Sequence, residues 1–330
     1  MEFGTSNIIL SIAIPTWNRA EYLKRCLESI EKDIQGKVLS LEIIVSDNCS
    51  TDNTQDIIQY FLKKGLPIKV FLNSENMGIE YNITQCYKKS NGKFVLVLGD
   101  DDFFIPGGIV YILELLKSYN SEQLGIVNFY NNSIYRKPNL IYKVYLNNVV
   151  FIKTLSYWVT FISGNIINKD LLGDLNISKY EGSFLTQVPY IYNAALRSKV
   201  NIIVYKPIII AEINNSGGYK LFDVFAKNYN QILNDFKRSG ISQSVINSIN
   251  NDMLLEFFPQ FVYKTRFDKK NKFSEKRIWP MIYNTHKFYI SFWMCITPLF
   301  ILPKLFSKIW LRIVINNFAS LRRRFRVNEN

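Results

Sequence analysis

The chain has 330 residues, of which 48% are hydrophobic and 20% charged, ample for one large domain or two smaller ones. Its cysteines, Cys26, Cys49, Cys86 and Cys295, show no CxxC or metal-ligand spacing and indicate free thiols in a reducing cytoplasm. The single histidine, His286, which we expect at the surface, argues against histidine-based catalysis and His-rich metal sites.

Most of the net charge of +13 lies in the C-terminal region. Residues 1–250 carry 25 Lys and Arg against 22 Asp and Glu, whereas residues 251–330 carry 15 against 5. This asymmetry indicates an anionic partner, either nucleic acid or a membrane surface. We expect residues 1–6 to be a vector-derived leader. No secretory signal follows, because the first apolar run is short and lacks basic flanks.

Strand and helix patterns alternate through the first 130 residues. Short apolar runs predict strands, and apolar residues at helical spacing between them predict helices. The predicted strands are Ile8–Ile14, Leu41–Ser46, Pro67–Leu72, Phe94–Leu98 and Leu124–Tyr130, and the predicted helices are Ala20–Ile34, Asn53–Lys64, Gly78–Ser90 and Gly107–Tyr119. This order predicts an α/β fold with a mostly parallel sheet flanked by helices. No Gly-x-Gly-x-x-Gly or Walker loop is present, which argues against a dinucleotide or ATP site.

Three consecutive carboxylates, Asp100, Asp101 and Asp102, follow the strand predicted at Phe94–Leu98 and Gly99. Open α/β sheets bind ligands at the carboxyl ends of their strands. Adjacent anions repel one another, so a cation should offset them, and Mg²⁺ or Mn²⁺ prefers oxygen ligands. A solvated acidic turn is the alternative interpretation.

The next hundred residues have a less regular pattern. We expect a hairpin and a loop in residues 131–163, followed by a tight turn at Gly164 into a strand. A helix at Phe184–Arg197, short strands at Asn201–Tyr205 and Pro207–Ala211, and a flexible polar loop at Asn214–Tyr219 complete this half. Beyond Leu221 the strand pattern disappears, and Leu221–Ser239 and Ser242–Arg266 are predicted amphipathic helices.

The C-terminal tail, residues 279–326, interleaves aromatic side chains with Lys and Arg. Its longest uncharged run, Phe288–Leu302, has 15 residues, whereas a membrane-spanning helix needs about 20, and Pro298 and Pro303 interrupt it. We therefore predict helices that lie in the interface of an anionic membrane. The alternative is a helical bundle packed against the catalytic domain or a second subunit, as in a homo-oligomer. Nucleic acid is not expected, because long aliphatic and aromatic runs fit lipid better.

Several motifs in order resemble the family 2 glycosyltransferases, which have the GT-A fold. These motifs are Ser11–Arg19, Ile43–Thr54, Asn76-Met77-Gly78 with Asn82, Asn91–Phe94, and Gly99–Asp102 with Pro106 and Gly107. The resemblance covers residues 8–116. Within the family the chain most resembles bacterial abequosyltransferase-like enzymes of O-antigen or capsule synthesis.

The resemblance implies roles for the predicted donor side. The loop residues Pro15, Thr16, Asn18 and Arg19 would meet the nucleotide base, and Asn76 would lie beside the nucleotide. Asp47 would accept hydrogen bonds from the base or ribose, since it precedes the helix cap and has no structural explanation. Asp100 would face the ribose or diphosphate. Asp101 would ligate Mg²⁺ or Mn²⁺, and Asp102 would position the acceptor or bind the metal indirectly. Many relatives have Asp in place of Gly99, so the choice of metal ligands stays open.

The resemblance also implies an acceptor side. Gly164 and Asn165 would flank the acceptor sugar. Glu181 is the candidate for the catalytic base, with Asp174 as the alternative, and a solvent-exposed helix-start residue is the structural interpretation of Glu181. We expect a catalytic domain over residues 7–220, with a nucleotide-sugar half (7–130) and an acceptor half (131–220), followed by a basic, aromatic helical region over 221–330.

The expected activity is inverting, metal-dependent transfer from a nucleotide-sugar donor to a lipid-linked glycan acceptor. The expected location is peripheral, on the cytoplasmic face of the bacterial inner membrane. One alternative is sugar transfer to polyprenyl phosphate itself. Another is a catalytically silent, membrane-bound assembly subunit, against which the intact acidic cluster argues.

Overall fold

A computed structural model describes residues 8–37, 39–129, 140–212, 219–268, 275 and 277–322. It divides into two compact units, one of residues 1–151, 158–182 and 186–215, the other of residues 152–157, 183–185 and 216–330. Part of the hairpin expected in 131–163, most of the loop expected at 214–219 and the arginines at 323–326 lie outside the described residues.

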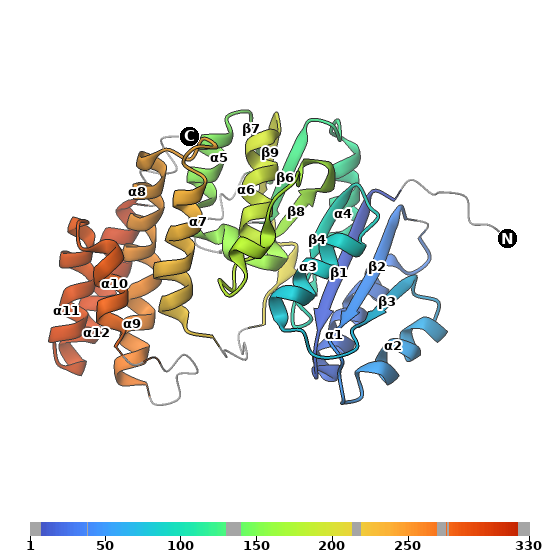
Figure 1. Ribbon diagram of the computed structural model, residues 1–330, viewed down its shortest axis with the longest axis horizontal. Coiled ribbons are helices and arrows are strands. Elements are labelled where there is room, and N and C mark those ends of the chain that lie inside the picture. Colours follow the sequence, from blue (N-terminus) through green and yellow to red (C-terminus); the bar gives the residue numbers. More distant parts are fainter. Residues whose placement is uncertain are drawn as a thin grey trace. The chain divides into compact units, whose positions relative to one another are not determined.

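A large sheet forms the centre of the first unit (Figure 1). Among the described residues it has eight strands in the order β3-β2-β1-β4-β8-β6-β9-β7. These are β1 (Leu10–Thr16), β2 (Leu41–Asp47), β3 (Ile68–Leu72), β4 (Phe94–Val97), β6 (Leu124–Phe129), β7 (Tyr142–Tyr145), β8 (Asn165–Asn168) and β9 (Val200–Val204). β1 to β4 run parallel, β8 runs antiparallel between β4 and β6, and β7 runs antiparallel to β9. The prediction of a mostly parallel sheet is therefore confirmed.

A separate two-stranded ribbon holds the segment that follows the acidic cluster. β5 (Phe103–Phe104) pairs antiparallel with β10 (Ile209–Ile210). The strand expected at Pro207–Ala211 therefore exists, but it pairs outside the main sheet. This pairing brings Ile209 and Ile210 next to the two residues that directly follow the acidic cluster.

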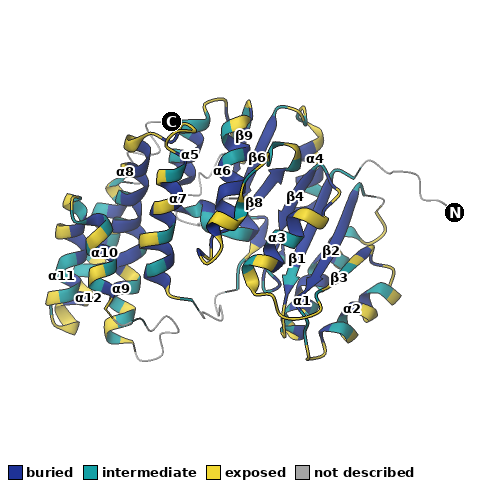
Figure 2. Cartoon of the chain, in the orientation of Figure 1, coloured by how far each residue is buried: buried dark blue, intermediate teal, exposed yellow. Residues whose placement is uncertain are grey.

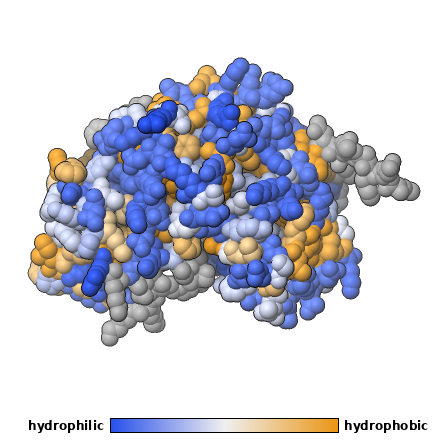
Figure 3. Space-filling model, in the orientation of Figure 1, coloured by the Kyte–Doolittle hydropathy of each residue, from blue (hydrophilic) through white to orange (hydrophobic). Residues whose placement is uncertain are grey.

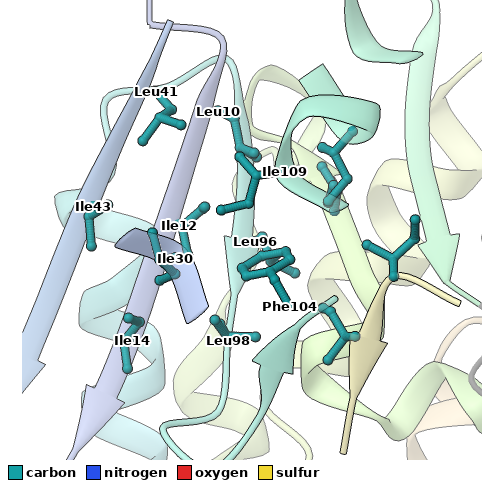
Figure 4. Packing of buried hydrophobic residues seen from close by; sticks show 14 of the residues in the cluster. Leu10, Ile12, Ile14, Ile30, Leu41, Ile43, Leu96, Leu98, Phe104 and Ile109 are labelled. Atoms are coloured by element: carbon teal, nitrogen blue, oxygen red, sulfur yellow. The ribbon is translucent and has the colours of Figure 1, made fainter. Parts of the chain in front are cut away.

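Helices cover the sheet of the first unit on both faces. They are α1 (Ala20–Ile34), α2 (Thr54–Lys63), α3 (Ile79–Lys89), α4 (Gly108–Lys117) and α6 (Gln187–Arg197). Figure 4 shows Ile30 of α1 and Ile109 of α4 packed over Ile12 and Leu96 of neighbouring strands. Alternate residues of a strand point to opposite faces, so the next residues, such as Ala13, are buried on the other face. The inner strands, such as β1, β2, β4 and β6, are thus buried on both sides (Figure 2), which explains their continuous apolar runs, whereas the edge strands β3 and β7 are partly exposed.

The second unit contains helices only, among its described residues. They are α7 (Tyr229–Asp235), α8 (Gln243–Asp252), α9 (Phe258–Phe267), α10 (Ile278–His286), α11 (Thr297–Ile301) and α12 (Lys304–Ile313), while α5 (Asn148–Leu155) spans the boundary between the units. π-helical turns join several of them, as at Met253–Phe257 between α8 and α9. Phe222, Phe258 and Phe292 are fully buried in this unit. Among the described residues no helix is long and apolar enough to cross a membrane.

The expectation that His286 lies at the surface is wrong. Its side chain is fully buried at the end of α10, where Nδ1 lies 2.6 Å from Thr285 Oγ1 and Nε2 lies 3.3 Å from Asn250 Oδ1. Burial lowers the pKa of His286 to about 4, so the imidazole is neutral at pH 7. The buried imidazole is accommodated because Thr285 and Asn250 provide hydrogen-bond partners for its two nitrogens.

Candidate active site

The acidic cluster lies where β1 and β4, two neighbouring parallel strands, end. Leu98 N donates to Ala13 O, which keeps the strands paired up to the residue before Gly99. β1 continues through Pro15 to Thr16, two residues further than expected. Thr16 Oγ1 therefore reaches Asp100 and donates to its Oδ2 at 2.8 Å.

Arg19 supplies a cation to two of the three carboxylates. Its Nη1 lies 3.1 Å from Asp100 Oδ1, and its Nη2 donates to Asp101 Oδ2 at 2.7 Å. The guanidinium also lies 4.6 Å from the centroid of the Tyr22 ring, which fixes its plane. The predicted donor-loop residues Thr16 and Arg19 thus contact the predicted acidic residues directly.

Burial makes ionisation of Asp100 costly. Only 3% of this residue is exposed. Desolvation raises the pKa of Asp100 to about 7, although Arg19 and the hydroxyl of Thr16 oppose the shift. The neighbouring carboxylates of Asp101 and Asp102 add to it. At neutral pH this site therefore carries less negative charge than three free aspartates would.

Asp102 points to a different strand from its neighbours. Its Oδ2 accepts a hydrogen bond from Ser163 Oγ, which itself accepts from Gly99 N at 2.8 Å. The backbone N–H of Glu212, beyond β10, also donates to Asp102, and desolvation raises the pKa of Asp102 to about 7. Asp102 thus connects the end of β4 with the turn before β8 and with the segment after β10.

Gly99 allows two carboxylates to converge. A Cβ placed on Gly99 would lie 3.0 Å from both Asp101 Oδ1 and Asp102 Oδ2. An Asp here, as in many members of the resembling family, would force these oxygens to move. Asp101 and Asp102 therefore take up space that a side chain at position 99 would need.

The carboxylates of the cluster fit a metal ion that is held partly by the substrate. Among the described residues no group of three or more His, Cys, Asp and Glu side chains is arranged to hold a metal ion. Mg²⁺ usually takes one or two carboxylates and completes its shell with waters and substrate phosphates. Asp101 and Asp102 suit that arrangement, because Asp101 Oδ1 has no hydrogen-bond partner in the described part of the chain. They do not form a complete all-protein cage.

The other predicted donor-side residues brace two loops. Ser50 Oγ accepts from Asn18 N at 2.8 Å, and Asn18 Oδ1 accepts from Thr51 N at 2.7 Å. Asn18 has a φ of 51°, a left-handed conformation that Asn tolerates better than most residues. Asn76 Oδ1 accepts from Asn48 Nδ2 at 2.7 Å. These contacts set the shape of the loops, and base contact by Pro15, Asn18 and Asn76 stays a prediction.

The expectation that Asp47 has no structural role is wrong. Asp47 is fully buried, and its Oδ1 accepts from the backbone N–H and the hydroxyl of Ser50 at 3.0 and 2.6 Å. Gln55 Nε2 donates to its Oδ2. Asp47 therefore holds the turn between β2 and α2, which the sequence pattern did not indicate. A role in donor binding remains a prediction.

On the predicted acceptor side, Asn165 and Gly164 are buried. Asn165 Nδ2 donates to Phe161 O at 2.7 Å, and Asn128 Nδ2 donates to both Asn165 Oδ1 and Gly164 O at 2.9 Å. Glu181 is exposed, and within the described residues its carboxylate makes no hydrogen bond to the acidic cluster. Asp174, the alternative base, is also exposed. The structure leaves both residues as candidates.

Sequence reasoning missed Ser163 and Asn48. Ser163 contacts both Gly99 and Asp102. The sequence feature that could have indicated it is the run Ser163-Gly164-Asn165, at the start of β8. Asn48 Oδ1 accepts from Asn73 Nδ2 at 2.8 Å and from Met77 N at 3.0 Å. Its signal was the position directly after Asp47, at the tip of β2.

Part of the chain is similar in sequence to known glycosyltransferases. Residues 11–167 match the family model described as glycosyl transferase family 2. The chain is 33% identical to the abequosyltransferase RfbV of Salmonella typhimurium over 120 aligned residues. This alignment covers 36% of this chain and 34% of the relative. Over 106 residues the chain is 34% identical to the GalNAc(5)-diNAcBac-PP-undecaprenol beta-1,3-glucosyltransferase of Campylobacter jejuni, covering 32% and 33%. The chain thus spans about a third of the length of these curated relatives.

Solved structures share the fold over nearly the whole chain. Staphylococcus aureus TarS 1–349 superposes with a TM-score of 0.56 at 19% identity, covering 98% of this chain and 92% of that one. The mannosyltransferase PcManGT from Pyrobaculum calidifontis, solved with GDP-Man and Mn²⁺, has a TM-score of 0.52 at 13% identity, covering 97% and 86%. Residues 11–167 therefore form a family 2 glycosyltransferase domain, and the chain that carries it has the GT-A-like fold.

Proposed function

We propose that this protein is an inverting, metal-dependent glycosyltransferase that moves a sugar from a nucleotide-sugar donor to a lipid-linked saccharide. The observation that carries the proposal is the contact between Arg19 and two of three adjacent carboxylates at the ends of β1 and β4. In an open α/β sheet this edge is the position of the ligand site. The family domain and the solved GDP-Man complex of PcManGT support a nucleotide-sugar donor, and the name of the Campylobacter jejuni relative, which contains an undecaprenol-linked saccharide, supports a lipid-linked acceptor.

In this proposal the cluster binds the diphosphate end of the donor. Asp101 and Asp102 would hold Mg²⁺ or Mn²⁺, which as a Lewis acid would stabilise the charge of the leaving nucleoside diphosphate. Arg19 would orient Asp100 and Asp101 through its paired N–H groups. Ser163 would hold Asp102 at one angle. Glu181, or else Asp174, would take the proton of the acceptor hydroxyl.

Thermal shift with a panel of nucleotide sugars, with and without Mn²⁺, tests this proposal. A donor at about 100 times its Kd should stabilise the protein by about 2.7 kcal/mol. The Asp101→Asn variant serves as the matched control, because it removes one charge at the cluster and keeps the side-chain shape. Stabilisation that is equal in wild type and variant, with or without Mn²⁺, would contradict the assignment. Activity on polyprenyl phosphate alone, without a saccharide, would favour the alternative acceptor.

We also propose that α12 contacts the anionic cytoplasmic face of the membrane. Leu305, Phe306 and Ile309 are 66%, 58% and 48% exposed, whereas the polar Ser307 is fully buried. Lys304, Lys308 and Arg312 are exposed on the same helix. Figure 3 shows hydrophobic surface at the edge where Figure 1 places α11 and α12. Exposed apolar side chains flanked by cations are typical of a helix in the lipid interface.

A triple substitution of Leu305, Phe306 and Ile309 by Ser tests the membrane contact. The substitutions remove exposed apolar area and leave the buried Val314 in place. Flotation with phosphatidylglycerol vesicles should show binding by wild type and its loss in the variant. A dimer of wild type that becomes a monomer in the variant, with no vesicle binding by either, would assign this face to a second subunit instead.

A further inference from the structure

The second unit contains a polar cavity that the proposed reaction does not use. It has a volume of about 550 Å³, within the range of about 300–1,000 Å³ typical of small-molecule sites. α7, α8, α10 and the turn after α10 form its walls. Amide side chains dominate the lining, and they are Asn230, Asn234, Gln243, Asn247, Asn250 and Asn251.

The lining of this cavity is neutral. No Lys, Arg, Asp or Glu is among the described residues that line it, although residues 251–330 carry 15 basic against 5 acidic residues. His286, which contacts Asn250 behind the lining, is buried and neutral at pH 7. The lysine beside the lining, Lys287, has its Nζ 5.2 Å from the Phe288 ring centroid, so an anionic ligand would find no cation among the described residues that line the cavity itself. The cavity therefore fits a ligand that is polar and uncharged.

Hydrogen bonds join the amides, from a buried pair to the exposed mouth of the cavity. Asn250 is 2% exposed, and its Nδ2 donates to Asn230 Oδ1 at 2.7 Å and to Tyr289 OH at 3.0 Å. The hydroxyl of Tyr289 then donates to Asn247 Oδ1 at 2.9 Å. Gln243 Nε2 donates to the same oxygen at 2.9 Å. Asn247 is thus oriented by two donors on its oxygen.

This network leaves hydrogen-bonding groups unused at the cavity. Within the described residues Asn247 Nδ2 has no partner, and Asn234 uses its Nδ2 on Asn230 O while its Oδ1 has none. Gln243 Oε1 is likewise without a partner there. These three amides are exposed, and their free donor and two free acceptors match a ligand with several hydroxyls, because each hydroxyl both donates and accepts. The rings of Phe288, which is 88% exposed, and Tyr289 add apolar surface for C–H groups.

We infer that this cavity is a saccharide-binding subsite for neutral sugar residues. A sugar ring is uncharged, carries several hydroxyls and has apolar C–H faces. Its hydroxyls can therefore bond to the amides, and its C–H groups can pack on the aromatic rings. The biological source of the sugar rests on the proposed function: it would be a residue of the glycan acceptor or product. Binding of the sugar itself does not depend on transfer.

Saturation-transfer NMR and calorimetry on the full chain test the subsite. The probes are methyl glycosides of glucose, galactose, mannose, N-acetylglucosamine and N-acetylgalactosamine. Concentrations of up to about 10 mM would detect a weak complex with a Kd of about 1 mM. At least one should bind, and Asn247→Ala should weaken its affinity about tenfold, because the variant removes the free donor and the oxygen that Tyr289 and Gln243 use. Asn284→Ala, an exposed asparagine of α10 outside the lining, is the matched control and should bind like wild type.

Three outcomes would overturn the inference. The first is no binding of any of these glycosides by wild type. The second is binding that Asn247→Ala leaves intact and Asp101→Asn abolishes, since the sugar would then occupy the acidic cluster. The third is loss of phosphatidylglycerol-vesicle binding in Asn247→Ala without any glycoside binding, which would assign the cavity to the membrane. Thermal shift with nucleotide sugars reports separately on the proposed function, so failure of one does not imply failure of the other.

Discussion

Replacing Asp100 by Asn should stabilise the metal-free protein. The pKa of Asp100 rises from 3.8 to about 7 on folding, chiefly because the carboxyl is desolvated. A group whose folded pKa is raised contributes stability below its unfolded pKa, and that stability is lost as the pH rises through the folded value. Three pKa units at about 1.4 kcal/mol each give a cost of about 4 kcal/mol at pH 8.

Asn resembles the protonated acid, so the variant avoids this cost. Its oxygen can still accept from Thr16, and Arg19 keeps its contact with Asp101. The amide NH₂ lacks an acceptor, which costs about 1–3 kcal/mol. We therefore expect a net gain of about 1–3 kcal/mol at pH 8.

Urea unfolding in EDTA measures the gain in stability of Asp100→Asn. The avoided cost should fall to about half between pH 8 and pH 5.5, because the folded carboxyl takes up its proton over that range. A variant that is less stable than wild type at pH 8, or a gain that does not shrink on acidification, would refute the reasoning. Thr16→Val, which removes only the hydroxyl next to Asp100, is the control and should destabilise the protein.

Asp101→Asn should lower kcat at least about 10²-fold and remove any stabilisation by Mn²⁺, measured by transfer assay and thermal shift, because it removes the charge that we propose binds the metal. Glu181→Gln should lower kcat by about 10²–10⁴-fold with donor affinity unchanged, and a drop below about tenfold would turn attention to Asp174. His286→Gln should abolish an acid-sensitive part of the stability: with a folded pKa of about 4 against 6.5, wild type loses about 3 kcal/mol as the pH falls between these values. Equal pH slopes for the two proteins in urea unfolding would count against the buried neutral imidazole.

Local pattern was enough to locate the elements that form the site. α1 has the bounds that helical spacing predicts, and β4 lies where the apolar run predicts a strand. The bounds of these elements depend on residues close in sequence, and the spacing of apolar residues therefore predicts them. The position of the acidic cluster at a strand end follows from the same information.

The pairing of side chains within the site could not be predicted. Arg19 and Asp101 are 82 residues apart, and Ser163 and Asp102 are 61 apart. The second contact depends on β8 being inserted antiparallel between β4 and β6, which the order of elements does not indicate. The partners of two buried asparagines were likewise not predicted: Asn82 donates to Ser46 O and Asn165 to Phe161 O.

The charges of the cluster predict how donor and metal binding depend on each other. The cluster has three carboxylates and one guanidinium, which contacts two of them, so the site remains negative unless protons or a divalent cation are bound. A diphosphate would be repelled by that charge, and a cation between them would remove the repulsion. UDP or GDP alone should therefore bind weakly, and Mn²⁺ should raise its affinity. Because coupling is reciprocal, the nucleotide should raise the affinity for Mn²⁺ by the same factor. Calorimetric titrations in both orders measure the two factors, and coupling should disappear in Asp101→Asn. Strong nucleotide binding in EDTA, equal to that with Mn²⁺, would show that Arg19 alone offsets the carboxylates.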